Sequence, residues 1–480
     1  MWDNKDLFVS LTGTDSGGFR DHDDQSNLKL NANMGVALND SAETRFYLSG
    51  NVIEQALPGS VSKSSALNDP ESAAAFAEST DWKRDIRSLR LANKTTFALN
   101  DGGLLDIGAF VNAKDLFHPI TPFVGIIDQE SIDYGVFVER SGEHNLGGRE
   151  NQFKLGFRTH SGHVDAKVFQ NIAGSRGALT SDADQTSHNA VLYGENLFYM
   201  QPEWALVTGL QAVWSKRDYE DNINSAENDD DTFAAINPKL GVLYEPTENL
   251  QYFANVSRSY EPPTFSELTQ GGTVGFTPVD AQNAWTAEIG TRGSHGMASW
   301  DISLYRAWVK DEMLQFTTGV GVPASTFNAD DTIHQGVELG FALQLSDQWQ
   351  WRNAYTYSDF HFDGDSQYGD NEIAGQPEHF YQTELRYTHS DGWFVAPNLE
   401  LASSSYVDFA NTLEASGYGI VGLNAGYAVN DRISFYLDGR NLLDKRYIST
   451  YSTTVNSFGN TAVFYPGEGR AFYAGMRVKF

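Results

Sequence analysis

The chain has 480 residues and no cysteine, with 33 Lys and Arg against 63 Asp and Glu, which gives a formal net charge of −30 at pH 7. This charge disfavours nucleic acid as a partner, because nucleic-acid binding requires a basic surface, and the lack of cysteine fits an oxidising compartment. No stretch approaches the roughly 18 apolar residues of a membrane-spanning helix, whereas 13% aromatic residues and 44 glycines suit many strands joined by turns.

Segments in which apolar and polar residues alternate follow one another along the whole chain, and alternation with a period of two predicts strands. In the first half they are Asp6–Thr14, Leu28–Leu38, Thr44–Glu54, Lys83–Leu99, Leu104–Leu116, Ser131–Glu143 and Asn151–Gln170. In the second half they are His188–Met200, Trp204–Arg217, Phe233–Tyr244, Leu250–Tyr260, Trp285–Arg292, Ser299–Phe316, Ile333–Leu345, Gln348–Phe360, His379–Thr388, Trp393–Val407, Tyr418–Ala428, Arg432–Tyr447 and Gly469–Phe480. The sequence therefore predicts about twenty strands. No linker or change of composition divides them, so residues 1–480 are expected to form a single domain.

Tight turns alternate with much longer connections. Asn100–Gly103, Leu146–Arg149 and Pro246–Asn249 are examples of the short kind, and residues 55–81 are an example of the long kind. Short turns at one rim and long loops at the other are typical of outer-membrane barrels, in which they are periplasmic and extracellular respectively.

The last segment shows the two faces that such a barrel requires. One parity carries Phe472, Ala474, Met476, Val478 and Phe480, and the other carries Tyr473, Gly475, Arg477 and Lys479. In a membrane barrel the apolar face meets lipid and the polar face lines a watery lumen. A large soluble sandwich produces the same local pattern, so a soluble all-β binding protein remains an alternative. The fold class predicted is all-β, an antiparallel transmembrane β-barrel.

Several segments of the C-terminal half resemble, in order, the motifs of TonB-dependent outer-membrane receptors. They are Tyr252–Leu268 (Y-F-A-N-V-S-R-S-Y-E-P-P-T-F-S-E-L), Trp285–Gly293, Asn328 with Gly336–Glu338, Gly375–His379, Asn441–Tyr447 and the terminal Phe480. The N-terminal half is similar more loosely, through Gly18–Asp21 and Leu57–Gly59. The resemblance implies a barrel of 22 strands filled by an N-terminal plug domain.

Asp6–Leu38 is similar to the third and fourth strands of that family. We therefore expect the chain to hold strands 3–22, without the plug and the first hairpin. If the ring closes without them, Gly469–Phe480 must pair with Asp6–Thr14.

The alternation directs six polar side chains toward the lumen, where they could contact a ligand or the plug. They are Arg90, Lys94, Glu288, Glu338, Tyr436 and Arg440. The alternative is a network of ion pairs between strands that only tolerates water.

No catalytic, metal or cofactor site is predicted. Acidic residues cluster in two loops, around residues 220–231 and 363–372, but without the spacing of a calcium-binding loop, so solvated loops are expected. His118, His334 and His379 form no metal-binding pair, and no nucleophile or phosphate-loop motif is present, so an enzyme is not expected.

The resemblance implies uptake of a scarce ligand across the outer membrane, most often a ferric siderophore. A receptor for cobalamin, a sugar or another non-iron ligand is the alternative within transport. The partners implied are this ligand, outer-membrane lipid and, in the full-length protein only, the TonB complex.

Overall fold

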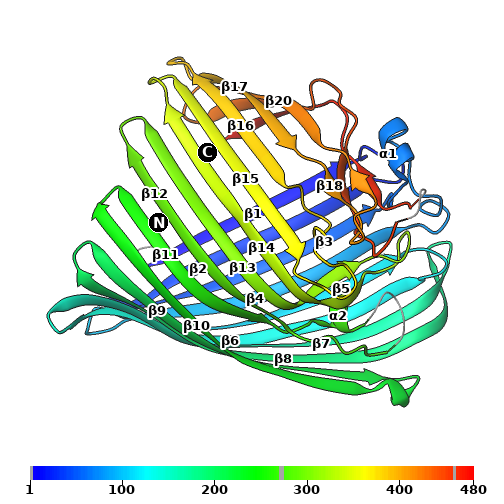
Figure 1. The fold of residues 1–480 in the computed structure, drawn as a ribbon, viewed down its shortest axis with the longest axis horizontal. Helices are drawn as coiled ribbons and strands as arrows, with labels where there is room; N and C mark the ends of the chain where they lie inside the picture. Colours follow the sequence, from blue (N-terminus) through cyan, green and yellow to red (C-terminus); the bar gives the residue numbers. More distant parts are fainter. Residues whose placement is uncertain (1–3, 270–274, 458–460, 480) are drawn as a thin grey trace.

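A computed structural model describes residues 4–269, 275–457 and 461–479. Its main feature is one antiparallel sheet of 20 strands (Figure 1). The strands of this sheet are β1 (Lys5–Ser16), β2 (Gln25–Asn39), β3 (Ala42–Ala56), β4 (Lys83–Ala98), β5 (Leu104–Pro119), β6 (Ile126–Leu146), β7 (Arg149–Ile172), β8 (Ser175–Gln201), β9 (Trp204–Asp221), β10 (Asp229–Thr247), β11 (Leu250–Glu261), β12 (Gln282–His295), β13 (Ala298–Phe316), β14 (Ser325–Gln344), β15 (Trp349–Phe362), β16 (His379–Thr388), β17 (Trp393–Ala402), β20 (Tyr418–Ala428), β21 (Ile433–Arg440) and β24 (Ala471–Val478). The described residues contain no helix with the length and apolar character that crossing a membrane requires.

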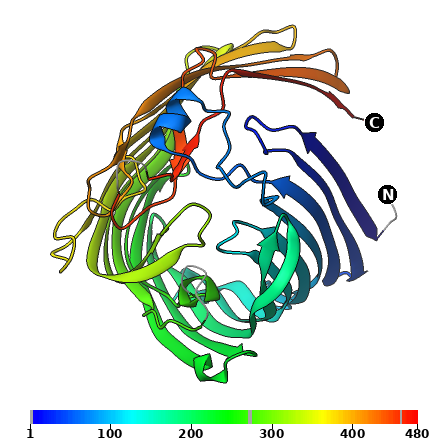
Figure 2. The same cartoon turned by 90° about the vertical axis from the view of Figure 1, so that its right-hand side faces the viewer.

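Each strand pairs with the next strand of the sheet along the chain, and the sheet curls into a ring (Figure 2). The long connections contain short elements: α1 (Lys63–Asn68), α2 (Phe265–Leu268), the pair β18 (Ser405–Tyr406) and β19 (Glu414–Ala415), and the pair β22 (Ile448–Tyr451) and β23 (Phe464–Pro466). β1 pairs only with β2, and β24 only with β21, among the residues that are described. The direct pairing of the two end strands is therefore not formed, and the ring has an open seam between them (Figure 2).

The polar face of the sheet is the concave one. Side chains two strands apart meet over intervening glycines on this face: Arg45 and Asp6 over Gly35, Tyr193 and Glu139 over Gly156. Such contacts require the curvature to bring alternate strands together. Since paired residues share a face, the register then assigns every strand, and Leu7, Leu210, Ile289, Leu304 and Met476 among others point outward. We call the two sides the lumen face and the outward face.

Two rows of aromatic side chains border the outward apolar belt. At the end with short turns lie Trp204, Tyr244, Tyr252, Trp300, Trp351, Tyr387, Trp393 and Tyr427, and at the end with long loops lie Trp214, Trp285, Trp308 and Tyr357. Trp204 stacks on Tyr244 with ring centroids 4.3 Å apart. Eight to ten residues separate the rows on β13 and β9, which is about 26–33 Å of strand at about 3.3 Å per residue. At a tilt of about 40° this gives a belt roughly 20–25 Å tall, the height of a transmembrane barrel.

Fully buried apolar side chains gather in the long loops, because the strands expose one face to the lumen and the other to the outside. One cluster joins residues 57–82 to the two loops that precede β20 and β24, and contains Val61, Val407 and Phe464. A second contains Phe362, Tyr368 and Phe409. The loops are thus a packed layer over one end of the barrel (Figure 2).

Each predicted strand overlaps an observed one, but three bounds differ by seven residues or more: β8 begins at Ser175, β14 begins at Ser325 and β21 ends at Arg440. Residues 171–187 were expected to be a loop, but β7 and β8 continue to a tight turn at Ala173 and Gly174, both of which have positive φ. This extension stands beyond the apolar belt, and because both of its faces are polar it lacks the alternation that predicts a strand. Phe480, which the sequence places at the end of the last strand, lies outside the described residues.

Candidate ligand passage

All six side chains predicted to face the lumen lie at lumen-face positions of the register. Their strands are β4 for Arg90 and Lys94, β12 for Glu288, β14 for Glu338, and β21 for Tyr436 and Arg440. They are distributed around the ring and do not form one cluster. Whether they contact a ligand or a plug remains a prediction.

Four of the six contact, or lie opposite, groups of their own or an adjacent strand. Glu288 accepts a 2.9 Å hydrogen bond from Asn255 Nδ2 of the adjacent strand, and Arg440 Nε donates to Asp438 of its own strand at 2.7 Å. Tyr436 lies over Gly475, where an added Cβ would come within 2.1 Å of the ring. Glu338 lies between Ser303 and Thr356 of the adjacent strands.

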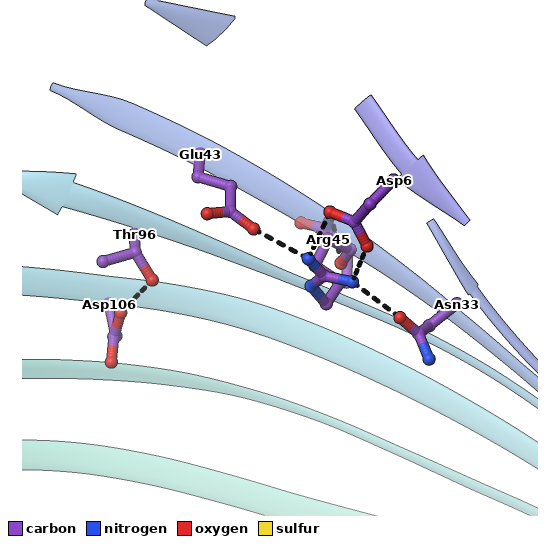
Figure 3. A network of polar contacts seen from close by, with 7 residues as sticks. Asp6, Asn33, Glu43, Arg45, Thr96 and Asp106 are labelled. Carbon is purple, nitrogen blue, oxygen red and sulfur yellow. Dashed lines mark hydrogen bonds and ion pairs between the residues drawn. The ribbon is translucent and has the colours of Figure 1, made fainter. Parts of the chain in front are cut away.

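Lys94 belongs to an ionic network near the turn end of β1–β5, of which Figure 3 shows Asp106, Thr96 and the partners of Arg45. Its Nζ lies 2.8 Å from Asp106, which also accepts a hydrogen bond from Thr96. Beside it, Arg45 makes a bidentate contact with Asp6, at 2.7 Å for both bonds, and further bonds to Asn33 at 2.6 Å and Glu43 at 3.1 Å. These charged side chains are paired with one another. This part of the lumen face therefore fits a network of ion pairs between strands better than a ligand-binding site.

Arg90 differs because no carboxylate of the described chain forms a salt bridge with it. Its guanidinium carbon lies 5.2 Å from the centroid of the Phe110 ring, a cation–π contact. Phe110 also meets His160 edge to face, with centroids 5.5 Å apart. His160 Nε2 lies 3.7 Å from Asp133, which is itself 3.4 Å from Asn112 Nδ2. We call Arg90, Asn112, Phe110, Asp133 and His160 the mid-lumen cluster.

Only Arg90 of the mid-lumen cluster was singled out from the sequence. The turn at residues 100–103 fixes the register of β4 on β5, which places Ala92 opposite Phe110 and Arg90 opposite Asn112. The turn at residues 146–149 does the same for β6 and β7 and places Tyr134 opposite Ser161. If the residues of each hairpin are paired one by one outward from its turn, the sequence alone brings the members of the cluster together.

The motifs that carry the family resemblance fasten the loops to one another. Arg20, from the Gly18–Asp21 motif, donates to Gly59 O at 2.7 Å and to Ser72 O at 2.7 Å, so the two N-terminal motifs meet. Asn328 Nδ2 donates to the carbonyls of Asp280 and Asp311. Asn441, at φ 46°, bonds to Lys445 and Glu468 and turns the chain out of β21. These residues therefore join the loops at the mouth.

Loops from opposite sides of the ring meet across the mouth. Residues 317–324 leave β13, nine positions from β4 in the sheet. Val320 packs against the cluster of Trp82, Ala77 and Ile120, and an added Cβ at Gly321 would come within 2.7 Å of the Trp82 ring. The mouth is therefore bridged and narrower than the barrel below it (Figure 2).

The acidic loops act as turn caps. Asp365 accepts the N–H groups of Gln367 and Tyr368, and Asp221 accepts those of Ile223 and Asn224. The described residues contain no group of three or more His, Asp or Glu side chains placed to hold a metal ion. His118, His334 and His379 contact Lys83 O, Glu312 and Tyr355 respectively.

Asp408 joins the loop before β20 to the loop before β24. Its carboxylate accepts bonds from the N–H of Thr412 at 2.8 Å and of Leu413 at 3.0 Å, from the Thr412 hydroxyl, and from Ser457 Oγ at 3.0 Å. Burial alone would raise the pKa of Asp408, but these hydrogen bonds together hold the pKa below its ordinary value. A carboxyl with a lowered pKa in the folded state adds stability above about pH 4, and the contribution is lost as the pH falls through the lowered value.

Asp408→Asn is accordingly expected to lower the local stability of residues 403–417 by about 2 kcal/mol at pH 7, since charge-assisted hydrogen bonds become neutral ones. Hydrogen exchange of this loop measures the change. In the unsubstituted protein, acidification to pH 3 should likewise lower the protection of this loop relative to the intrinsic exchange rate at that pH. Asp370→Asn is the control, because Asp370 is an exposed loop carboxylate that, among the described residues, accepts a hydrogen bond from the Gly364 N–H alone. Equal exchange in both variants would contradict the role given to Asp408.

Comparison with known proteins agrees with this architecture. Residues 2–442 match the family described as TonB dependent receptor-like, beta-barrel. The chain is 24% identical over 265 residues to the vitamin B12 transporter BtuB of Photobacterium profundum, and 24% over 273 residues to the catecholate siderophore receptor Fiu of Escherichia coli (strain K12). These matches cover 53% and 51% of this chain but only 42% and 33% of those proteins, less than half of either.

Solved receptors share the fold. The unliganded ferric citrate transporter FecA superposes with a TM-score of 0.86 at 17% identity, covering 100% of this chain and 74% of FecA. The siderophore receptor PiuA from Acinetobacter baumannii gives 0.80 at 15% identity, covering 99% and 78%. These relatives are receptors and transporters of the outer membrane, and not enzymes. With its outward apolar belt, its polar lumen and the family match over residues 2–442, the chain belongs to the TonB-dependent receptor β-barrel family and is an outer-membrane protein.

Proposed function

We propose that this barrel serves a receptor that takes up a ferric siderophore. The siderophore receptors among its relatives support this ligand class, and the mid-lumen cluster supplies chemistry that suits it. Ferric complexes of catecholates are anionic and aromatic, and the cluster offers a cation beside an aromatic ring.

The observation that carries the proposal is the state of Arg90. It is exposed at mid-height in the lumen, and none of the described residues forms a salt bridge with it. Asp133, the carboxylate of the cluster, lies 3.7 Å from His160 Nε2 and 3.4 Å from Asn112 Nδ2 and forms no salt bridge with Arg90. An anion that reaches Arg90 therefore gains a charge-assisted contact without displacing a protein carboxylate.

A plug domain and two further strands would complete the receptor. The sheet holds 20 strands and leaves one edge of β1 and one edge of β24 unpaired in the described chain. The unpaired N–H and C=O groups of such edges are costly in lipid. Two more strands would pair both edges and give the 22 strands of outer-membrane transporters that contain a plug. In the complete protein the TonB complex would supply the energy for uptake.

Arg90→Gln is expected to weaken binding of a ferric tris-catecholate by about tenfold, equivalent to about 1.4 kcal/mol. Equilibrium binding to protein purified in detergent measures the loss. Arg292→Gln is the matched control, because Arg292 also lies over a phenylalanine on the lumen face, 5.0 Å from Phe253, but stands near the turn end, opposite Asp301 of the adjacent strand. Equal losses of affinity in the two variants would show that Arg90 does not form the binding site.

A receptor for cobalamin is the second candidate, favoured by the match to BtuB at the same 24% identity. Binding of cyanocobalamin with no detectable binding of ferric catecholates would decide for it. A ligand affinity that falls steeply with added salt would instead favour the anionic ferric complex, because salt screens the attraction between an anion and Arg90.

A further inference from the structure

The outward face contains a groove that crosses the apolar belt. It has a volume of about 780 Å³ and runs between two rows of outward side chains on β9–β15. Leu206, Val242, Ile289 and Leu304 are members of one row, and Leu240, Val256 and Arg306 of the other. Small residues such as Ala254 and Ala287 make the groove deep, and aliphatic side chains line most of it.

Because it crosses tilted strands, the groove extends from near the turn-end border of the apolar belt to near its loop-end border. On β9 it starts at Leu206, two residues from Trp204 of the turn-end aromatic row. On β13 it reaches Arg306, two residues from Trp308 of the loop-end row, and its lining continues to Val337 on β14 and Tyr357 on β15. Between Leu206 and Arg306 the groove crosses the four strand spacings from β9 to β13, which is about 19 Å at about 4.8 Å each. This suits a chain that runs from an interface toward the middle of a hydrocarbon core about 30 Å thick.

Arg306 is a cation on the lipid-facing side of the sheet. Its Nη1 donates to Gln335 Oε1 at 2.8 Å, and its guanidinium carbon lies 5.3 Å from the Trp308 ring. Its Nε is shielded from solvent and has no hydrogen-bond partner. No carboxylate of the described residues makes a salt bridge with it, because the nearby Asp359 is held by Gln335 at 2.6 Å and by His361 at 2.7 Å.

A cation with unused donors is costly beside lipid unless an anion meets it. We propose that the groove binds an acyl lipid of the outer membrane whose phosphate-bearing headgroup contacts Arg306 and whose chain lies between the two rows. The position of Arg306 at the border, with the apolar part of the groove deeper in the belt, matches an amphiphile in both charge and polarity.

The test uses the full chain in non-ionic detergent, titrated by native mass spectrometry with dioleoyl phosphatidic acid and with dioleoylglycerol, which has the same chains but no phosphate. The phosphatidic acid should bind at least tenfold more tightly. Arg306→Gln should abolish this preference. Lys310→Gln should keep it, because Lys310 is an outward cation of the same strand that does not line the groove.

Two further arms separate the headgroup from the groove. Ala287→Leu should weaken both lipids alike, because the added side chain fills the groove. Inorganic phosphate should compete only at concentrations far above those of the lipid. The proposal is overturned if the two lipids bind equally, if Arg306→Gln and Lys310→Gln behave alike, if Ala287→Leu binds both lipids as tightly as the unsubstituted chain, or if free phosphate competes as well as the lipid. Heat-modifiable migration in gels verifies that each variant is folded.

Discussion

Leu210→Arg is expected to destabilise the barrel in a membrane by about 2–4 kcal/mol. Leu210 is 55% exposed on the outward face of β9, midway between Trp204 and Trp214. The cost of an arginine on the lipid face is highest at the middle of the bilayer and falls toward its borders. Urea titration of the protein folded in lipid vesicles measures the loss.

Gln211→Arg is the matched control, since residue 211 is the next position on the same strand and lies on the lumen face opposite Asn237. A long cation there reaches water, so the change in stability should be below about 1 kcal/mol. Equal destabilisation by the two variants would mean that the two faces do not differ as described.

Arg20→Met is expected to release the loop of residues 57–82 from the mouth, with a local loss of about 3–5 kcal/mol. Arg20 is 8% exposed, and it donates three hydrogen bonds, from Nε and Nη2 to Ser72 O and from Nη1 to Gly59 O. Burial lowers the pKa of Arg20, yet an arginine remains charged at any physiological pH. Its removal leaves two carbonyls that have lost charge-assisted donors. Hydrogen exchange of residues 57–74 reports the release.

Arg20→Lys should fall between the unsubstituted protein and Arg20→Met, because an ammonium cannot span both carbonyls as the planar guanidinium does. Arg84→Gln, at an exposed arginine that bonds Gln55 at 3.1 Å, should leave exchange of this loop unchanged. Protection of residues 57–74 that survives Arg20→Met would show that the apolar contacts alone hold the loop.

Strands that lie wholly within the apolar belt were predictable residue by residue. His379–Thr388 and Tyr418–Ala428 have the same bounds in sequence and structure, because lipid on one side and water on the other impose strict alternation. Where strands leave the belt this constraint disappears. β8 therefore begins at Ser175 and not at His188, and the expected strand Arg432–Tyr447 ends at Arg440, where Asn441 adopts a positive φ.

The orientation of side chains was predictable, but their partners were not. Alternation places Arg90 in the lumen, whereas its neighbours Phe110 and His160 depend on the registers of three hairpins. Arg20 and Ser72 are 52 residues apart and meet through loop packing that has no period. Arg306 shares its parity with Leu304 and Trp308, so its outward position could have been predicted from the sequence, although its groove depends on seven strands.

The membrane barrel is defined by one division, between an outward face in lipid and a lumen face in water. Because the chain has no cysteine, single cysteines at residues 204–214 of β9 can carry a nitroxide label without other changes. In lipid bilayers the labels at even positions should be accessible to oxygen, and those at odd positions to a water-soluble nickel complex. Loss of this two-residue alternation, or protection of both faces from both reagents, would contradict the membrane barrel.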